Sequence, residues 1–303
     1  MKIRFWGTRG SIPTPGPDTV RYGGNTPCVE VQCDDTLIIL DAGSGLRPLG
    51  MDLLGRGNGP FKAHLLLSHF HWDHIQGFPF FVPAYIPGNQ LTIYGAEGMS
   101  RGLEDILNGQ MADDYFPIAL NEMGSSREYR AINEETFKID DVYVTSRYVN
   151  HPGVALCYRF EYKGRTFCYI SDNEPQYYLA KHGQGQEGIL DSFKQDIEER
   201  EIKMGQLDLD LVEFLKGVDV LVHDCQYTPD EYCMKIGWGH SFFQFPVEVA
   251  MLSGVQQLVI FHHDPMHSDE FIDQMLEQAQ KIVSERGSEV VCQAAREGME
   301  IDI

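Results

Sequence analysis

Basic residues are scarce in this chain. Lysine and arginine together number 24 against 45 aspartates and glutamates, which gives the 303 residues a formal net charge of −21. A field this negative repels nucleic acids and anionic membrane surfaces unless a local basic patch overrides it, and the sequence contains no cluster of lysine or arginine. We therefore expect neither a nucleic acid nor a membrane as the partner of this protein.

Long hydrophobic runs and disulfide patterns are also missing. No run approaches the roughly 18 apolar residues that span a bilayer, and residues 1–7 lack the features of a signal peptide. The seven cysteines are odd in number, and no two have Cys-x-x-Cys spacing. A reduced cytosol fits this pattern better than an oxidising compartment. We expect a cytoplasmic protein, with a homodimer left open.

Hydrophobic residues make up 43% of the chain, which is enough for a large core. Apolar and β-branched runs predict strands, whereas helical spacing with stop signals predicts helices. The predicted strands cover residues 2–5, 28–33, 36–40, 64–68, 91–94, 142–146, 155–162, 166–171, 218–223 and 257–261. A closing strand pair is predicted at 290–292 and 299–301, and helices at 99–108, 190–202, 209–215, 246–252 and 269–286.

The order of these elements predicts an α/β fold. The first half is mostly strand, and the pattern of strands then repeats, which indicates two β-rich halves packed face to face with helices outside. No repeat, low-complexity tract or long linker divides the chain. We expect one domain covering residues 1–303, with the polar stretch 179–216 as a surface insertion.

Residues 68–74 read Ser-His-Phe-His-Trp-Asp-His, an H-x-H-x-D-H pattern that follows an apolar strand. Imidazole and carboxylate ligands together suit zinc, with iron or manganese as alternatives. In extended backbone His69 and His71 point the same way, whereas the neighbours Asp73 and His74 diverge toward a second site. Three histidines this close are rarely structural, so the loop predicts a centre for two metal ions.

One loop cannot complete two metal sites, and further ligand-type residues stand at later strand ends. His151 follows the strand at 142–146, Asp172 ends the strand at 166–171, and His262 ends the strand at 257–261. Junctions of strand and loop are where sites are usually built. Taken singly, each of these residues could equally be a cap or turn residue, but the histidine-rich loop favours the metal interpretation.

These motifs, in this order, resemble the metallo-β-lactamase superfamily, and the resemblance spans nearly the whole chain. It implies a four-layer αββα sandwich and a full set of metal ligands. By resemblance, His69, His71 and His151 hold one metal, Asp73, His74 and His262 hold the other, and Asp172 bridges both. His263 stands beside His262 and is the alternative ligand. Asp41, in Leu-Asp-Ala-Gly-Ser-Gly, resembles the buried aspartate that orients the imidazoles in this family, although it could be only a turn residue.

Two metals that share a carboxylate also share a water, which becomes a hydroxide near neutral pH and attacks an electrophile held by the same metals. This chemistry fits phosphodiesters, lactams and thioesters alike. Two further features favour phosphodiesters by resemblance to the ribonuclease Z-like branch, which includes cyclic-phosphate phosphodiesterases. They are a Gly-His-Ser segment before a helix and a His-acid pair at a strand end. By this resemblance, His240 assists the leaving oxygen, and Asp224 orients His240. His223 fits a structural role at the strand end better than a catalytic one.

The sequence thus predicts a dinuclear, metal-dependent phosphodiesterase in which Asp73 is both a ligand and the proton acceptor. Its best substrate is a small anionic diester, such as a cyclic nucleotide or cyclic phosphate. The basic arm that ribonuclease Z uses to bind transfer RNA is not found here. The alternatives are a transfer-RNA 3′-processing endonuclease, a redox iron member of the fold and a non-enzymatic metal-binding protein. Several aromatic residues after the metal loop could stack a base, but they fit a core role better: Trp72, Phe78, Phe80, Phe81 and Tyr85.

Overall fold

The structure is a computed structural model that describes residues 1–57, 59–96, 101–183, 189–199 and 201–303. Within these ranges the strands form two sheets of seven strands each. The first sheet contains β1 (Lys2–Gly7), β2 (Cys28–Cys33), β3 (Thr36–Leu40), β4 (Lys62–Leu66), β5 (Gln90–Gly95), β6 (Ser126–Ala131) and β14 (Glu300–Asp302). Its strand order is β14-β1-β2-β3-β4-β5-β6.

The second sheet has the order β13-β12-β11-β10-β9-β8-β7. Its strands are β7 (Glu135–Ile139), β8 (Val142–Tyr148), β9 (Leu156–Tyr162), β10 (Arg165–Ile170), β11 (Val220–Asp224), β12 (Gln257–Phe261) and β13 (Val291–Ala294). β8 alternates buried and exposed residues in its first half, whereas β11 is buried along its whole length. That difference is expected because parallel central strands are covered on both faces.

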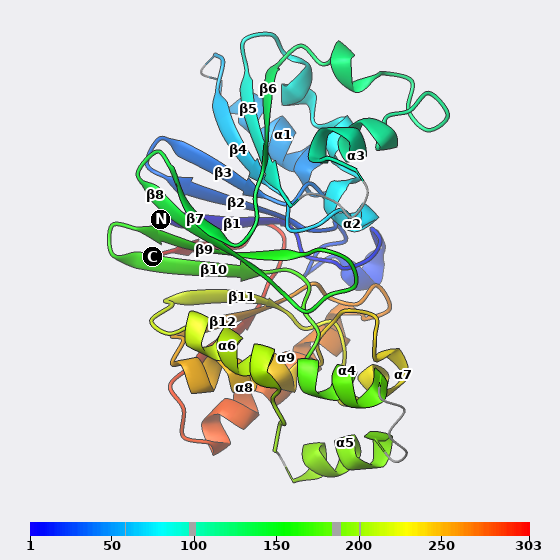
Figure 1. Ribbon diagram of the computed structural model, residues 1–303, viewed down its shortest axis with the longest axis vertical. Coiled ribbons are helices and arrows are strands. Elements are labelled where there is room, and N and C mark those ends of the chain that lie inside the picture. The colour runs from blue at the N-terminus through cyan, green and yellow to red at the C-terminus, as the bar shows by residue number, and fades with distance from the viewer. Residues whose placement is uncertain (58, 97–100, 184–188, 200) are drawn as a thin grey trace.

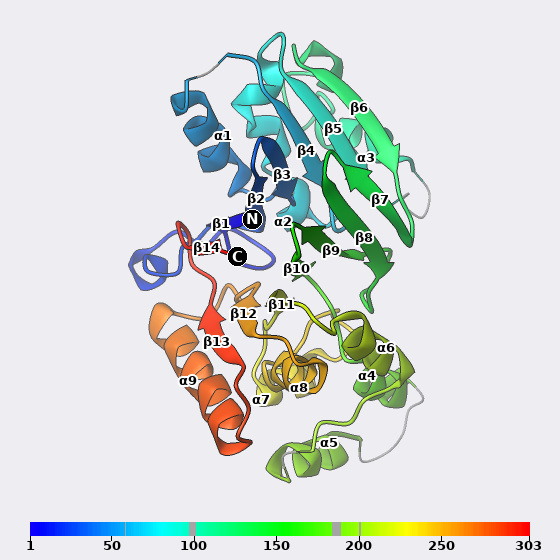
Figure 2. The same cartoon turned by 90° about the vertical axis from the view of Figure 1, so that its left-hand side faces the viewer.

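Helices cover the outer faces of both sheets (Figures 1 and 2). The helices are α1 (Leu46–Gly55), α2 (Trp72–Ile75), α3 (Leu103–Gln110), α4 (Gln176–Gly183), α5 (Ile189–Glu198), α6 (Gln206–Phe214), α7 (Pro229–Lys235), α8 (Gln244–Ser253) and α9 (Asp269–Glu285). Among the residues described, no helix combines the length and hydropathy needed to cross a membrane. The predicted four-layer αββα sandwich is confirmed.

Three apolar layers hold the sandwich together. One lies between the two sheets, and one lies beneath the helices on each outer face. The middle layer contains Phe160 and Phe167, whose rings stack at a centroid distance of 5.7 Å. Burial of apolar area in such layers is the main stabilising contribution to a fold of this kind.

The topology gathers strand ends at one edge of the sandwich. β10, β11 and β12 are parallel neighbours, with Ile170 opposite His223 and Asp224 opposite Phe261. β3 and β4 are also parallel, with Leu40 opposite Leu66. Because the carboxyl ends of parallel strands meet at the same edge, the loops that follow β4, β10, β11 and β12 converge there.

The structure differs from the predicted elements in several places. The predicted closing pair is wrong, because β13 pairs with β12 in the second sheet while β14 pairs with β1 in the first. The edge strands β6 and β7 were not predicted, since both are short and rich in polar residues, and β7 buries only Phe137 and Ile139. Of the predicted helix 99–108, residues 99 and 100 lie outside the described ranges, and α3 begins at Leu103.

The polar stretch 179–216 contains α5 and α6. That it is an insertion remains a prediction, but it is not purely surface: Phe193 is fully buried among the rings of Tyr178, Tyr232 and Phe242. Of the aromatic residues after the metal loop, Phe78 and Phe81 are buried, whereas Trp72 and Phe80 are exposed. The core interpretation therefore holds for only part of that group.

Substituting Phe160 with alanine should lower the free energy of unfolding by about 3–5 kcal/mol, because a fully buried ring between the sheets leaves a cavity. Tyr143→Ala on β8 is the control. Its side chain is half exposed, so its cost should stay below about 1 kcal/mol. Denaturant titration of both variants measures the difference. Equal losses would show that the layer between the sheets does not dominate stability.

Candidate metal centre

The loop after β4 presents its ligand-type side chains in two directions. His71 is extended and precedes the single turn of α2, which carries Asp73 and His74. The extended residues His69 and His71 therefore join one group of ligand-type side chains, and the helical residues Asp73 and His74 join another, as the motif predicts. All three of Asp73, His74 and His69 are buried, and only His71 reaches the surface.

The first group of ligand-type atoms comes from His69, His71, His151 and Asp172, and these atoms lie within 4.8 Å of one another. Nε2 of His151 lies 3.1 Å from Nδ1 of His71. Oδ2 of Asp172 lies 3.6 Å from Nε2 of His69 and 3.9 Å from Nε2 of His151. Two segments about 80 residues apart thus converge on one carboxylate oxygen.

The second group consists of Asp73, His74 and His262, also within 4.8 Å. Oδ2 of Asp73 lies 3.2 Å from Nε2 of His262 and 3.3 Å from Nε2 of His74. The other oxygen of Asp172, Oδ1, lies 3.3 Å from Nε2 of His74 and 3.4 Å from Nε2 of His262. The two oxygens of Asp172 therefore face two different groups of imidazoles.

The residues present fit divalent metal ions. Nε2 of His69, Nε2 of His74 and Oδ1 of Asp172 are buried and have no hydrogen-bond partner among the described residues. A buried polar atom without a partner costs free energy, so a cluster of such atoms pointing at one place indicates a missing ligand. Imidazoles and carboxylates are the donor set that zinc and related divalent ions prefer.

The outward-facing ring nitrogens of these histidines have partners of their own. Nδ1 of His74 lies 2.9 Å from Oδ2 of Asp41, Nδ1 of His262 lies 2.8 Å from Oε1 of Gln226, and Nδ1 of His151 lies 2.8 Å from the carbonyl oxygen of Gly239. Such acceptors keep the proton on Nδ1 and turn the Nε2 lone pair toward the centre. Burial lowers the pKa of His151 to about 4, so its ring is neutral, as a metal ligand must be.

Asp41 has the orienting position that the resemblance implied. Besides His74, its carboxylate accepts hydrogen bonds from the backbone and hydroxyl of Ser68 and from the hydroxyl of Tyr169. Tyr169 belongs to the second sheet, whereas Asp41 and Ser68 lie in the loops that follow β3 and β4 of the first. One buried carboxylate thus orients a histidine and joins the two sheets.

The neighbouring histidines 262 and 263 point in different directions. Nε2 of His263 lies 2.8 Å from the carbonyl oxygen of Ala295, and burial lowers the pKa of its ring to about 3. His262 has the left-handed φ of 60°, and its ring faces Asp73 and Asp172. The geometry favours His262 over His263 as the proposed ligand.

His240 and Asp224 lie together at the same centre. Nδ1 of His240 is 3.3 Å from Oδ2 of Asp224, and the ring stacks on His262 at 4.9 Å. Burial lowers the pKa of His240, but Asp224 and the other carboxylates more than offset this and raise it to about 9 without metal. His240 also forms a ligand-capable group with Asp172 and His262, so its geometry permits metal binding as well.

The structure adds a residue that the sequence did not single out. Glu174 is fully buried and accepts hydrogen bonds from the backbone of Gly237 at 2.7 Å, the backbone of Gly239 at 2.8 Å and the hydroxyl of Tyr232 at 3.0 Å. It thereby holds the loop that carries His240. Its only signal in the sequence is its place two residues after Asp172. His223, by contrast, bonds the carbonyl oxygen of Asp224 and packs beside Phe245, away from the centre.

Comparisons with known proteins agree with this fold. A family model described as "Beta-lactamase superfamily domain" matches residues 36–200, just over half of the chain. The protein therefore belongs to the metallo-β-lactamase superfamily. A protein named Ribonuclease Z from Thermoplasma acidophilum is 26% identical over 306 residues, which cover 93% of this chain and 91% of the relative. The predicted resemblance to the ribonuclease Z-like branch is confirmed.

Solved structures show the same fold. The metallo-beta-lactamase fold protein YhfI from Bacillus subtilis superimposes with a TM-score of 0.67 at 16% identity and covers 99% of this chain and 98% of its own. A diphosphatase from the PhnP family superimposes with a TM-score of 0.64 at 17% identity and covers 100% and 97%. At these identities the likeness concerns the fold alone.

Substituting Gly239 with alanine should weaken metal binding. Gly239 has a φ of +91°, and an added Cβ would collide with Nδ1 of His151 and Cδ of Pro152. Displacing a group that orients a metal-binding histidine typically costs about 10–100-fold in affinity. Gly237→Ala is a matched control, because Gly237 has a φ of +94° but its Cβ would meet no atom closer than 4.0 Å. Competition with a chromophoric chelator measures both affinities, and equal values would contradict this role of the loop.

Proposed function

We propose that this protein hydrolyses a small phosphodiester at a centre of two divalent metal ions. Zinc is the first candidate metal, with manganese or iron as alternatives, and a cyclic nucleotide or cyclic phosphate is the first candidate substrate. The observation that carries the proposal is Asp172, whose two oxygens face two separate groups of buried ligand-type side chains. By family, the protein is a metal-dependent hydrolase of the phosphodiesterase type, so the proposal concerns its metals and substrate.

The proposed ligands follow the two groups of the site. His69, His71 and His151 would hold one metal, Asp73, His74 and His262 the other, and Asp172 would bridge them. When bound, two such metals supply Lewis acidity that lowers the pKa of water and offsets negative charge on phosphoryl oxygens. The same Oδ2 of Asp73 that lies beside His74 and His262 also accepts a hydrogen bond from the backbone of Ser11 at 2.7 Å, which helps to fix the carboxylate. We assign to Asp73 the additional role of accepting a proton from the attacking water.

His240 is the proposed proton donor to the leaving oxygen. Its Nδ1 side is turned to Asp224, which also accepts hydrogen bonds from the backbone of Ser241 and Gln226. An imidazole held by a carboxylate keeps its proton more readily and donates it at its free nitrogen. Asp224 is thus a positioning residue for His240.

Ribonuclease Z activity on precursor transfer RNA is the second candidate. It is favoured by the 26% identity to a named Ribonuclease Z along almost the entire chain. The net charge of −21 opposes it, because each phosphate of a polyanion that approaches this surface must overcome the repulsion.

A turnover panel separates the two candidates. The metal-loaded protein should hydrolyse 2′,3′- and 3′,5′-cyclic nucleotides, a linear dinucleotide or a nitrophenyl diester faster than it processes precursor transfer RNA at physiological salt. The rates are compared as kcat/KM under identical conditions, with Asp73→Ala as the inactive reference. Processing of the transfer RNA at a rate near that of the small diesters would overturn the small-substrate proposal.

Replacing His240 with alanine should leave the metals bound but slow the hydrolysis of diesters with poor leaving groups. General acid catalysis typically contributes about 10²–10⁴-fold, whereas a nitrophenolate leaving group needs little protonation. The decisive quantity is the ratio of the two losses, measured beside the metal content. Equal losses would assign the proton to another group, and loss of a metal would make His240 a ligand, as its contact with Asp172 and His262 allows.

A further inference from the structure

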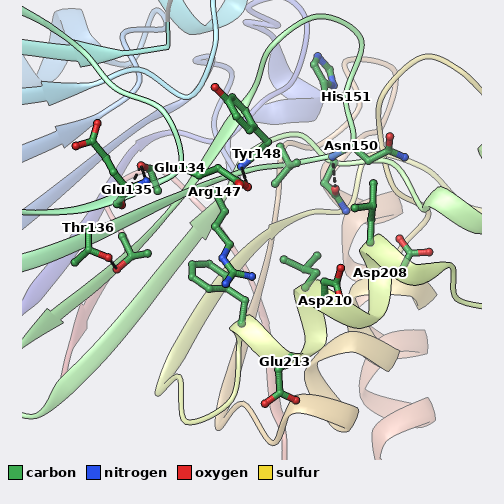
Figure 3. Close-up of a pocket in the computed structure, with 17 residues that line it drawn as sticks. Glu134, Glu135, Thr136, Arg147, Tyr148, Asn150, His151, Asp208, Asp210 and Glu213 are labelled. Carbon is green, nitrogen blue, oxygen red and sulfur yellow. Dashed lines mark hydrogen bonds between the residues drawn. The ribbon is translucent and has the colours of Figure 1, made fainter.

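A groove with a cavity volume of about 940 Å³ includes His151 of the candidate metal centre in its lining (Figure 3). It lies between the β7–β8 strand pair and helix α6, and Asn173, the neighbour of Asp172, also lines it. A phosphodiester held at the metals has two ester arms, and this groove is large enough to receive one of them. Its lining therefore bears on which alcohol that arm carries.

The groove is strongly acidic. Its lining carboxylates are Glu134, Glu135, Asp208, Asp210 and Glu213, against the single guanidinium of Arg147. Asp208 is buried and used within the fold, since it accepts hydrogen bonds from the backbone of Gln176, Tyr177 and Gly205. The other four carboxylates are exposed. Glu213 forms an ion pair with Lys216, whereas Glu134, Glu135 and Asp210 have no cationic partner among the described residues and are labelled in Figure 3. Arg147 lies over the ring of Phe214 at 4.7 Å rather than in an ion pair with these carboxylates.

A second feature at the inner end of the groove indicates a ligand. Asn173 is 3% exposed, and its Nδ2 has no hydrogen-bond partner among the described residues. Its Oδ1 accepts a hydrogen bond from the backbone of Asn150 at 3.1 Å, which fixes the orientation of the amide, because the reversed amide would set two donors against each other. Leaving a buried donor unpaired costs free energy. Asn173 belongs to the lining of the groove and directly follows Asp172 in the chain.

We propose that the groove binds an ester arm that carries an organic cation, an amine or a quaternary ammonium group, and that Nδ2 of Asn173 donates to an oxygen of the same diester. The proposal rests on the proposed function and narrows its substrate class. Exposed carboxylates attract a cation and repel a second phosphate, so the groove favours a linear diester with a cationic alcohol over a cyclic nucleotide.

Two nitrophenyl diesters that differ only in charge test the groove. p-Nitrophenyl phosphorylcholine carries a quaternary ammonium, and 3,3-dimethylbutyl p-nitrophenyl phosphate replaces that nitrogen with carbon. The choline ester should have the higher kcat/KM by about 5–10-fold at low salt, and the preference should shrink as salt screens the carboxylates. Choline alone should likewise inhibit more strongly than 3,3-dimethylbutanol.

Variants of the groove carboxylates locate the effect. Asp210→Asn combined with Glu135→Gln should bring the ratio of the two esters close to one. Glu277→Gln combined with Glu289→Gln removes the same charge from exposed positions outside the groove and should leave the ratio unchanged. Asn173→Ala should lower kcat/KM for both esters by about 10-fold or more at constant ratio and constant metal content, because it removes a hydrogen bond to a charged group.

The outcomes separate the two proposals. Equal, salt-insensitive rates for the two esters, or a preference that survives in the Asp210→Asn, Glu135→Gln variant, would overturn the cationic groove while leaving the phosphodiesterase proposal standing. Hydrolysis of neither ester, nor of any member of the small-diester panel, would overturn both. A change in the ester ratio on Asn173→Ala would overturn the assignment of this amide to a phosphate oxygen, because it would mean that the side chain contacts the alcohol arm instead.

Discussion

Asp172 is a carboxylate whose side chain exposes 1% of its surface, and each of its oxygens faces different imidazole nitrogens at 3.3–3.9 Å. Removing a charge from water costs several kcal/mol unless opposite charge or hydrogen bonds offset it. The histidines around it hold the pKa of Asp172 well below its usual range in spite of burial, and divalent metal ions between them would offset its charge further. The Nδ1 atoms of His74, His151 and His262 have hydrogen-bond partners of their own, which turns their Nε2 atoms toward Asp172.

The packing of the two sheets and the assembly of the site depend on the same contacts. The hydroxyl of Tyr169 reaches across to Asp41 at 2.7 Å, and the hydroxyl of Ser171 reaches Ser68 at 2.9 Å. The backbone of Leu156 donates to the carbonyl oxygen of Ser68 at the same junction. A shift of one sheet against the other would therefore separate the ligands of the proposed centre, which ties its geometry to the stability of the core between the sheets.

The charge of the protein acts differently on different parts of a substrate. Metals at the centre would attract the phosphate, whereas the acidic groove beside it repels any further anion. A small diester with one charged phosphate and a neutral or cationic arm satisfies both conditions better than a long polyanion. The same distribution favours the proposed small substrate over a transfer RNA, although the chain is 26% identical to a protein named Ribonuclease Z.

The sequence alone determined the metal loop, the class of fold and most of the buried strands. His69, His71, Asp73 and His74 lie within six residues, so chain connectivity by itself keeps them together, and apolar runs such as β12 mark buried strands without further information. The edge strands β6 and β7 were missed because they are short and mostly polar, and β7 adds only Phe137 and Ile139 to the core. The partners of β13 and β14 escaped it because pairing depends on distant segments.

Only the tertiary structure decided which side chains meet. His262 and His263 have the same chemistry, and a left-handed backbone at His262 sends one ring to the centre and leaves the other on Ala295. Glu174 accepts hydrogen bonds from Gly237 and Gly239, which lie more than 60 residues further along the chain. Asn173 lines an acidic groove that is likewise formed by distant segments. Side-chain direction and the proximity of distant segments are set by packing of the whole core, and no local pattern of residues records them.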